Sequence, residues 1–273
     1  MVIDIHSHLF EKRFDDDRDE TFARMKAADV ATITVGNDYV ESVKSIELAE
    51  KYNMWATVGL HPTDNMTEVF DYDKYKSLAQ NKRVVAIGEC GLDYFHGKNN
   101  ELGIMNYEGE KNRQKELFKK QIELALEVDK PLMLHCRDAY EDVLEILNSY
   151  FTIHNSRLRG NVHFFAGDWV TASKFLDIGF TLSFTGVLTF QPKADQPLAG
   201  AHSLIEVVKN VPSDCFMVET DAPYVAPVPY RGKRNEPVYV LETLKRVAEI
   251  RGISPQEAAR LTTATAKRTF ALS

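Results

Sequence analysis

Polar residues with metal-binding or acid–base side chains stand where short apolar runs end, along the whole length of this 273-residue chain. The runs are VID, MWATVGL, RVVAIG, PLMLH, NVHFF and CFMVET, and each is typical of a buried strand. The polar residues are His6, His8, His61, Glu89, His135, His163 and Asp221. Such side chains at six strand ends predict one shared metal site, which restricts the fold to those that bring many strand ends together.

The apolar runs alternate with amphipathic helical stretches, which is the pattern of βα units and a parallel sheet. Strands are predicted at 2–5, 31–35, 54–59, 83–88, 131–135, 161–165, 180–184 and 215–219. Helices are predicted at 19–28, 40–52, 112–128, 138–149, 168–178, 201–210 and 236–251, with a last helix after the expected N-cap Ser254. Because a (β/α)8 barrel takes about 250 residues, the pattern favours one α/β domain over 1–273 with the TIM-barrel fold. A doubly wound open sheet is the alternative, since periodicity cannot show closure.

Composition restricts the class of protein. Hydrophobic residues make up 44% of the chain, enough for a substantial core. The three cysteines, Cys90, Cys136 and Cys215, argue against a disulfide framework and favour a reducing cytoplasm. No apolar run approaches the roughly 18 residues of a membrane span, so we expect no membrane association. The net charge of −7 disfavours nucleic-acid binding over the whole surface, but divalent metals at one site would still attract a phosphate.

Five of the polar residues carry the metal argument from the first strand to the sixth. His6 and His8 are two residues apart, so a strand points both imidazoles to one face, where they can chelate one cation. Glu89 stands between an apolar strand and a turn with glycine, and a buried lone carboxylate is costly. It is therefore expected to bind a metal or to pair with a basic residue of the barrel. His135 and His163 are flanked by apolar residues that offer no local partner.

A pair of carboxylates ends the last apolar run. Glu219 and Asp221 share one face by the period of a strand, so we expect one to bind metal and the other to anchor structure. Asp221 is favoured as the ligand because it lies nearer the loop. A metal-bound carboxylate can also orient a nucleophilic water and take its proton.

Two connections are long for βα loops, whose usual length is about 2–6 residues. They are 91–111 and 220–235, and in a barrel both would lie at the C-terminal face, where active sites are built. Their aromatic residues are Tyr94, Phe95, Tyr107, Tyr224 and Tyr230. Aromatic rings stack on unpaired bases or fill a core, and the sequence leaves both roles open.

Six motifs follow one another in a characteristic order. They are DIHSH (4–8), GLHP (59–62), IGECGLDY (87–94), LHCRDA (134–139), ETDAPY (219–224) and RGKRNEP (231–237). Together they resemble the TatD family of metal-dependent hydrolases, within the amidohydrolase-like TIM barrels, from residue 2 to about 268. The chain departs from the family pattern in FFAG (164–167), where Cys-Phe-Ser-Gly is more usual, and in its longer 91–111 loop. These departures leave the choice of substrate open.

The resemblance implies a dinuclear centre for two divalent metal ions, Mg²⁺, Mn²⁺ or Zn²⁺. His6, His8, Glu89 and Asp221 would hold one ion, and Glu89, His135 and His163 the other. Asp221 and Glu89 would be the catalytic residues. His61 and Arg231 match positions near the scissile phosphate, and Arg137 is expected beside them as a further substrate contact.

The resemblance also implies a phosphodiester hydrolase, typically a 3′-to-5′ exodeoxyribonuclease. Its substrate would be DNA with single-stranded or frayed 3′ ends, and no obligate protein partner is predicted. One alternative is an ester or amide hydrolase on the same scaffold, such as an aminoacyl-tRNA deacylase. Another is a metal-free binding protein that keeps only the barrel. Arg231, Lys233 and Arg234 favour a phosphodiester, although tRNA also carries phosphates.

Overall fold

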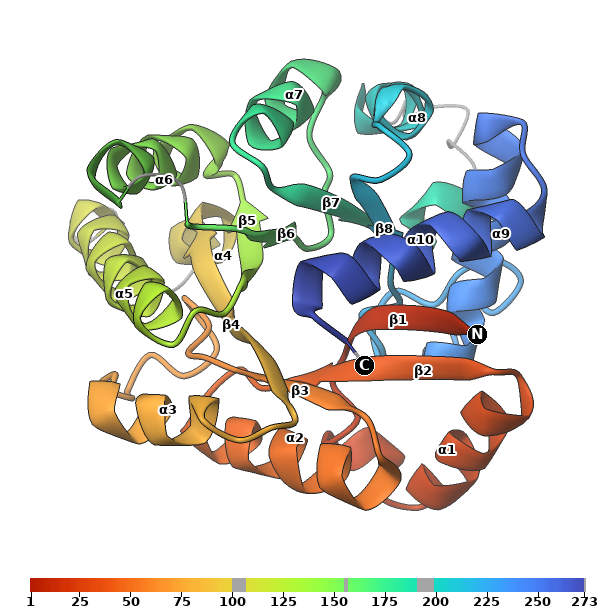
Figure 1. Cartoon of the computed structure of the whole chain (residues 1–273), viewed down its shortest axis with the longest axis horizontal. Helices are drawn as coiled ribbons and strands as arrows, with labels where there is room; N and C mark the ends of the chain where they lie inside the picture. The colour runs from red at the N-terminus through yellow and green to blue at the C-terminus, as the bar shows by residue number, and fades with distance from the viewer. Residues whose placement is uncertain (100–106, 155–156, 191–198, 273) are drawn as a thin grey trace.

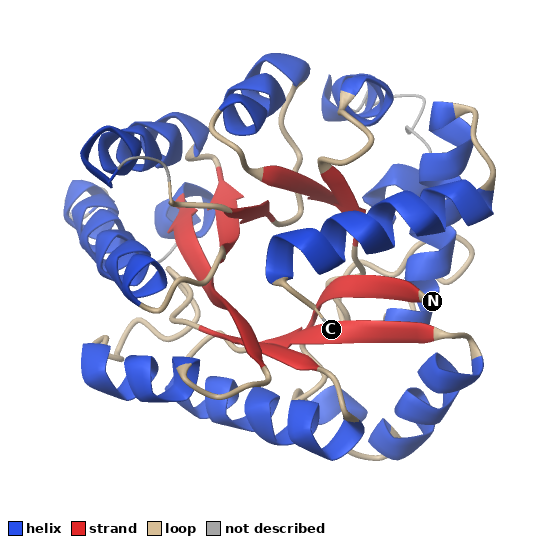
Figure 2. Ribbon diagram, in the orientation of Figure 1, coloured by secondary structure: helices blue, strands red, loops and turns tan. Residues whose placement is uncertain are grey.

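The protein forms a (β/α)8 barrel, known here from a computed structural model that describes residues 1–99, 107–154, 157–190 and 199–272 (Figures 1 and 2). The eight parallel strands are hydrogen-bonded in the order of the chain. They are β1 (Val2–Ser7), β2 (Val30–Val35), β3 (Trp55–Val58), β4 (Val84–Asp93), β5 (Leu132–Arg137), β6 (Gly160–Val162), β7 (Thr181–Phe184) and β8 (Phe216–Val218). This order confirms the predicted barrel, because an open doubly wound sheet changes direction at a switch point.

Helices follow the strands along the chain and surround them in space (Figure 2). The α-helices are α1 (Arg18–Ala27), α2 (Tyr39–Tyr52), α3 (Tyr72–Ala79), α4 (Tyr94–Asn99), α5 (Tyr107–Glu127), α6 (Tyr140–His154), α7 (Trp169–Asp177), α8 (Ala199–Asn210), α9 (Val240–Arg251) and α10 (Pro255–Phe270). Short 3₁₀ helices are η1 (Lys12–Phe14), η3 (Gly186–Thr189) and η4 (Pro237–Tyr239). All described strands belong to one sheet, while the single domain over 1–273 stays a prediction.

The first strand meets the segment that follows the last strand. The backbone N–H of Asp221 donates to the carbonyl of His6 (2.9 Å), and that of His8 donates to the carbonyl of Ala222 (2.7 Å). Beneath them the buried carboxylate of Asp4 accepts hydrogen bonds from the backbone N–H (2.8 Å) and hydroxyl (2.6 Å) of Thr220. These bonds bring His6 and His8 beside Asp221.

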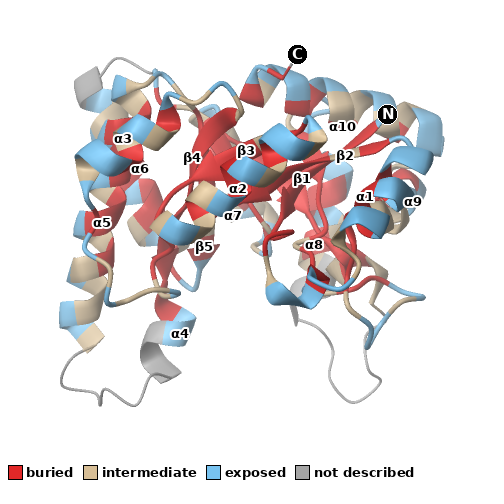
Figure 3. Ribbon diagram, turned by 90° about the horizontal axis from the view of Figure 1, so that it is seen from below, coloured by how far each residue is buried: buried red, intermediate tan, exposed pale blue. Residues whose placement is uncertain are grey.

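Helix α10 covers the N-terminal end of the barrel. Its residues Ala266 and Phe270 join a buried cluster of strand side chains that includes Ile3, Met133 and Met217. In Figure 3 this helix and both chain termini lie at one end of the molecule, and helix α4, which follows β4, lies at the other. This buried apolar cluster, called here the plug, closes the N-terminal end of the barrel. The carboxyl ends of the strands, at the other end, are left to form a site.

Truncation of Phe270 should reveal how much this plug stabilises the barrel. The ring is 2% exposed, so Phe270→Ala removes a large buried side chain and leaves a cavity. We expect the free energy of unfolding to fall by about 3–5 kcal/mol in urea titrations followed by circular dichroism. Val69→Ala, at a side chain 84% exposed, is the control and should change it by less than about 0.5 kcal/mol. Equal stability of both variants would contradict a structural role for α10.

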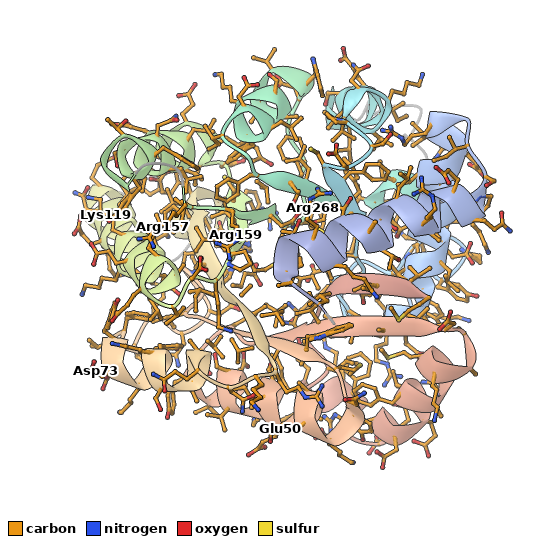
Figure 4. All side chains as sticks on the ribbon, viewed as in Figure 1. Glu50, Asp73, Lys119, Arg157, Arg159 and Arg268 are labelled. Atoms are coloured by element: carbon orange, nitrogen blue, oxygen red, sulfur yellow. The ribbon has the colours of Figure 1, made fainter. Side chains whose placement is uncertain are left out.

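The outer surface of the helical layer is charged. Glu50 on α2 and Asp73 on α3 point away from the barrel (Figure 4).

Within the described residues, no helix has the length and apolar composition that crossing a membrane requires.

The predicted elements differ from the structure mainly in three places. Helix α3 was not predicted, because its eight residues bury only Tyr75 and Ala79, too few for a periodic signal. Strand β4 and helix α4 take up the first part of the predicted 91–111 loop, while 100–106 lie outside the described residues. Strand β6 ends before His163 because the chain turns at Phe164, whose φ is 48°.

Candidate metal centre

A cleft of about 780 Å³ opens at the carboxyl ends of the strands. Among the predicted site residues, those that line it are His8, His61, Glu89, His135, Arg137, His163 and Asp221. His6 lies fully buried below them, in contact with His8 and Glu89. Arg231 is not among the lining residues, and its guanidinium lies over the ring of Phe190, 3.7 Å from the centroid.

Four side-chain atoms, from β1 and the residue that follows it, from β4 and from the segment after β8, converge in a first donor set. Nε2 of His6 lies 3.2 Å from Nε2 of His8, 3.1 Å from Oε2 of Glu89 and 4.0 Å from Oδ1 of Asp221. Nε2 of His8 lies 3.3 Å from the same Asp221 oxygen. Ligand atoms that each stand about 2.0–2.2 Å from one cation are separated by roughly 3 to 4 Å. The set therefore fits one divalent cation.

The other oxygen of Glu89 faces a second donor set. Oε1 lies 2.7 Å from Nδ1 of His135 and 3.6 Å from Nε2 of both His163 and His61. One carboxylate thus presents a separate oxygen to each of two groups of imidazoles. His61, predicted as a phosphate contact, lies as close to Glu89 as the predicted ligand His163 does, so the geometry fits either role.

Groups behind the imidazoles fix which nitrogen faces the cleft. Nδ1 of His8 donates to the carbonyl of Val35 (2.9 Å), which leaves the Nε2 lone pair for a cation. Nε2 of His135 donates to Asp93 (3.1 Å). Partners of this kind set the tautomer, hold the ring and raise the basicity of a metal-binding histidine.

Glu219 is held in place by its neighbours. Its Oε1 accepts from the backbone N–H of Phe164 (2.6 Å) and lies 3.1 Å from Nδ1 of His163, while Oε2 accepts from the hydroxyl of Ser183 (2.8 Å). Both oxygens therefore have partners within the barrel wall. Asp221 instead presents Oδ1 to His8 and lines the cleft, the arrangement expected if Asp221 binds the metal and Glu219 anchors structure.

Burial and close charges shift the pKa values of the cluster in opposite directions. Burial, reinforced by His163, lowers the pKa of His6 to about 3. Burial opposes ionisation of Glu89, but the surrounding histidines, His6 first, hold its pKa well below the usual range. Burial also opposes charging of His8, yet Asp221 raises its pKa to about 9. His6 is thus held neutral and Glu89 ionised, the states in which each side chain can bind a cation.

Comparison with known proteins identifies the family. The family model described as TatD related DNase matches residues 3–271. The chain belongs to the TatD family. It is 39% identical over 274 residues to the metal-dependent hydrolase YabD of Bacillus subtilis, covering 99% of both chains. It is 32% identical to the 3′-5′ ssDNA/RNA exonuclease TatD of Salmonella typhimurium, covering 98% of both.

Solved structures show the same fold. YjjV, a TatD homologue from Escherichia coli, superposes with a TM-score of 0.85 at 24% identity, over 100% of this chain and 98% of that one. A TatD family hydrolase from Entamoeba histolytica gives 0.80 at 21% identity, covering 98% and 97%. By the family match and the sequence relatives, which show the family, the protein is a metal-dependent hydrolase of the TatD family.

Two carboxylates of this TatD-family site were not predicted from the sequence. Asp93 ends β4 and faces His135, and Asp64 lies 3.0 Å from Nδ1 of His61. A signal for Asp93 was present, since it is an acid four residues after Glu89 in an apolar stretch with two glycines. Asp64 lies in a polar turn, where an aspartate is ordinary.

Replacement of Asp93 with asparagine should weaken metal binding while keeping the shape of the side chain. The change removes the negative charge behind His135, so the imidazole becomes a poorer ligand. We expect affinity for Zn²⁺, measured against a chromophoric chelator, to fall about 10–100-fold. His96→Ala removes another partner of Asp93 (2.7 Å) and should change the affinity far less. Equal losses in the two variants would contradict a specific role for the Asp93–His135 contact.

Proposed function

We propose that this TatD-family protein is a phosphodiester hydrolase that removes nucleotides from the 3′ ends of single-stranded DNA with two divalent cations. The observation that carries the proposal is the position of Glu89, which offers one oxygen to each donor set. A carboxylate so placed would help to hold two cations, which together would supply the chemistry of phosphodiester displacement. The donor atoms fit Mg²⁺, Mn²⁺ or Zn²⁺, because imidazole and carboxylate do not single out one of them.

The chain's own residues divide the remaining work. When bound, the cations would supply a water of lowered pKa and neutralise charge on the phosphate. Asp221, whose side chain is 15% exposed at the cleft, would orient that water and take its proton. His61 and Arg137 line the cleft beside the donor sets and would contact phosphoryl oxygens. Arg231, which does not line the cleft, would contact the DNA strand farther from the metal centre.

The proposal of a nucleic-acid substrate is supported by the name of a relative and depends on the charge of the site. The Salmonella protein that is 32% identical carries the name of a 3′-5′ ssDNA/RNA exonuclease, which supports a nucleic-acid substrate. The chain as a whole is acidic, so attraction of a polyanion would depend on cations at the centre. The free cysteines suit a reducing compartment, and we propose the cytoplasm.

End-labelled DNA tests the proposal. A single-stranded 20-nucleotide DNA is labelled at either the 5′ or the 3′ end and incubated with protein in Mg²⁺, Mn²⁺ or Zn²⁺. We expect early release of the 3′ label as a mononucleotide, a descending ladder from the 5′ label, and no reaction in EDTA. Absence of release with every cation would overturn the proposal. Deacylation of aminoacyl-tRNA without DNA cleavage would favour the ester-hydrolase alternative.

A further inference from the structure

Two aromatic rings are exposed at the mouth of the cleft. Phe95 is 39% exposed and Tyr224 is 41% exposed, and across the described residues no other Phe, Tyr or Trp is as open to solvent. Tyr224 lines the cleft, and Phe95 lies against Arg137, which also lines it. Large rings are usually buried, so exposure confined to this rim points to a ligand that covers them.

The two rings lie on opposite sides of the barrel. Phe95 belongs to α4, directly after β4, and Tyr224 follows β8. In a closed barrel of eight sequential strands, β4 and β8 stand across from each other. The donor sets of Glu89 and Asp221 therefore lie between the two rings.

Each ring carries an arginine from the neighbouring βα unit. The guanidinium of Arg137, the last residue of β5, lies 4.0 Å from the Phe95 centroid, and that of Arg13, in η1 after β1, lies 4.6 Å from the Tyr224 centroid. Arg13 also lies 3.4 Å from Glu11, whereas in the described part of the chain no ion pair joins Arg137 to a carboxylate. Because a guanidinium covers one face of each ring, a base would stack on the opposite face.

The floor and the rim of the cleft differ in charge. Carboxylates line the interior, namely Asp64, Glu89, Asp93, Asp138 and Asp221. The arginines of the two pairs stand at the edges, beyond the donor sets. A polyanion that reached the centre would thus meet Arg137 at one edge and, at the other, Arg13, whose charge Glu11 partly offsets.

We propose that Phe95 with Arg137 and Tyr224 with Arg13 form two stacking platforms that hold one unpaired nucleic-acid strand across the metal centre. This inference rests on the proposed nuclease function and specifies its substrate contacts. One platform receives the terminal nucleotide and the other the body of the strand. Each ring stacks on a base, and each guanidinium contacts a phosphate. Because the bases within a duplex have both faces covered by their neighbours, the platforms favour unpaired ends.

Single variants test each platform on the 20-nucleotide DNA. Phe95→Ala and Tyr224→Ala should each lower kcat/KM about tenfold, since stacking of one base on an aromatic ring contributes on that scale. Arg137→Ala should reduce the slope of log kcat/KM against log salt concentration by about 0.7, the value for one phosphate contact on a single strand. Metal content and thermal midpoint should equal those of the wild type.

A substrate without bases separates stacking from general damage. DNA in which the last three nucleotides at the 3′ end and the three before them are abasic should be a poorer substrate for the wild type. It should give no further loss in the Phe95→Ala, Tyr224→Ala double variant. Lys51→Ala is the matched control, because its ammonium lies over Tyr52, 4.6 Å from the centroid, and Tyr52 does not line the cleft. This control should leave both kcat/KM and its salt dependence unchanged.

The outcomes distinguish the two proposals. Unchanged kcat/KM in both ring variants, while the wild type digests DNA, overturns the platforms and leaves the nuclease function standing. An equal penalty for abasic DNA in the wild type and the double variant also overturns them. Failure of the wild type to cut DNA with any cation removes the proposed function itself.

Discussion

Replacement of Glu89 with glutamine will remove most of the hydrolase activity and at least one equivalent of metal. Each oxygen of this carboxylate faces a different donor set, at 3.1 Å from His6 and 2.7 Å from His135. Glutamine keeps the shape but offers only one neutral oxygen, and its amide nitrogen would point at an imidazole. We expect kcat on single-stranded DNA to fall on the order of 10³-fold or more, as for removal of a principal electrostatic group. Mass spectrometry of the dialysed protein will count the metal.

Glu50→Gln is the matched control for this change. Glu50 lies exposed on α2 and accepts a hydrogen bond from Asn81 (2.9 Å), which glutamine can also accept. This variant should keep wild-type activity and metal content. Circular dichroism should show the same fold for both variants. A Glu89→Gln protein with both metals and the wild-type rate would exclude Glu89 as the shared ligand.

Replacement of Asp221 with asparagine will separate proton transfer from metal binding. The amide can still present an oxygen to the first donor set, beside His6 and His8, but it cannot accept a proton from water at neutral pH. We expect kcat to fall about 10²–10⁴-fold, the contribution typical of a general base, with a much smaller change in KM. Multiple-turnover digestion of end-labelled DNA gives kcat, and single-turnover digestion gives the rate constant of the chemical step.

Asp138→Asn controls for loss of charge in the same cleft. Asp138 lines the cleft outside both donor sets, and its φ of 55° is one that asparagine adopts readily. We expect this variant to retain most of the activity. If Asp138→Asn and Asp221→Asn lost activity equally, the effect would reflect the cleft's overall charge and would contradict a specific role for Asp221.

The strand ends could be predicted from sequence because parallel strands buried on both faces are almost continuously apolar. Against that background a histidine or carboxylate at the end of a run stands out, as His135 and Glu89 do. Alternation along a strand also placed His6 and His8 on one face, and their Nε2 atoms lie 3.2 Å apart. The barrel itself followed from the repeated βα pattern.

Contacts between distant segments could not be predicted in the same way. The approach of His61 to Glu89 and the support of His135 by Asp93 depend on how neighbouring strands pack, which no local pattern encodes. The pairing of Arg13 with Tyr224 joins loops at opposite ends of the chain. The aromatic residues of the long loops are evident in the sequence, but which of them remain exposed depends on packing between distant segments.

The hydrogen bonds that join β1 to the segment after β8 also set the order in which the protein can mature. Asp4 and Thr220 are 216 residues apart, and the same junction brings His6 and His8 to Asp221. During synthesis from the N-terminus, the first two imidazoles must therefore wait for nearly the whole chain before the proposed ligand set is complete. A cation that binds only the finished barrel stabilises it by about 2.7 kcal/mol at one hundred times its dissociation constant. Cellular metal supply would then govern how long each copy survives as well as how fast it works.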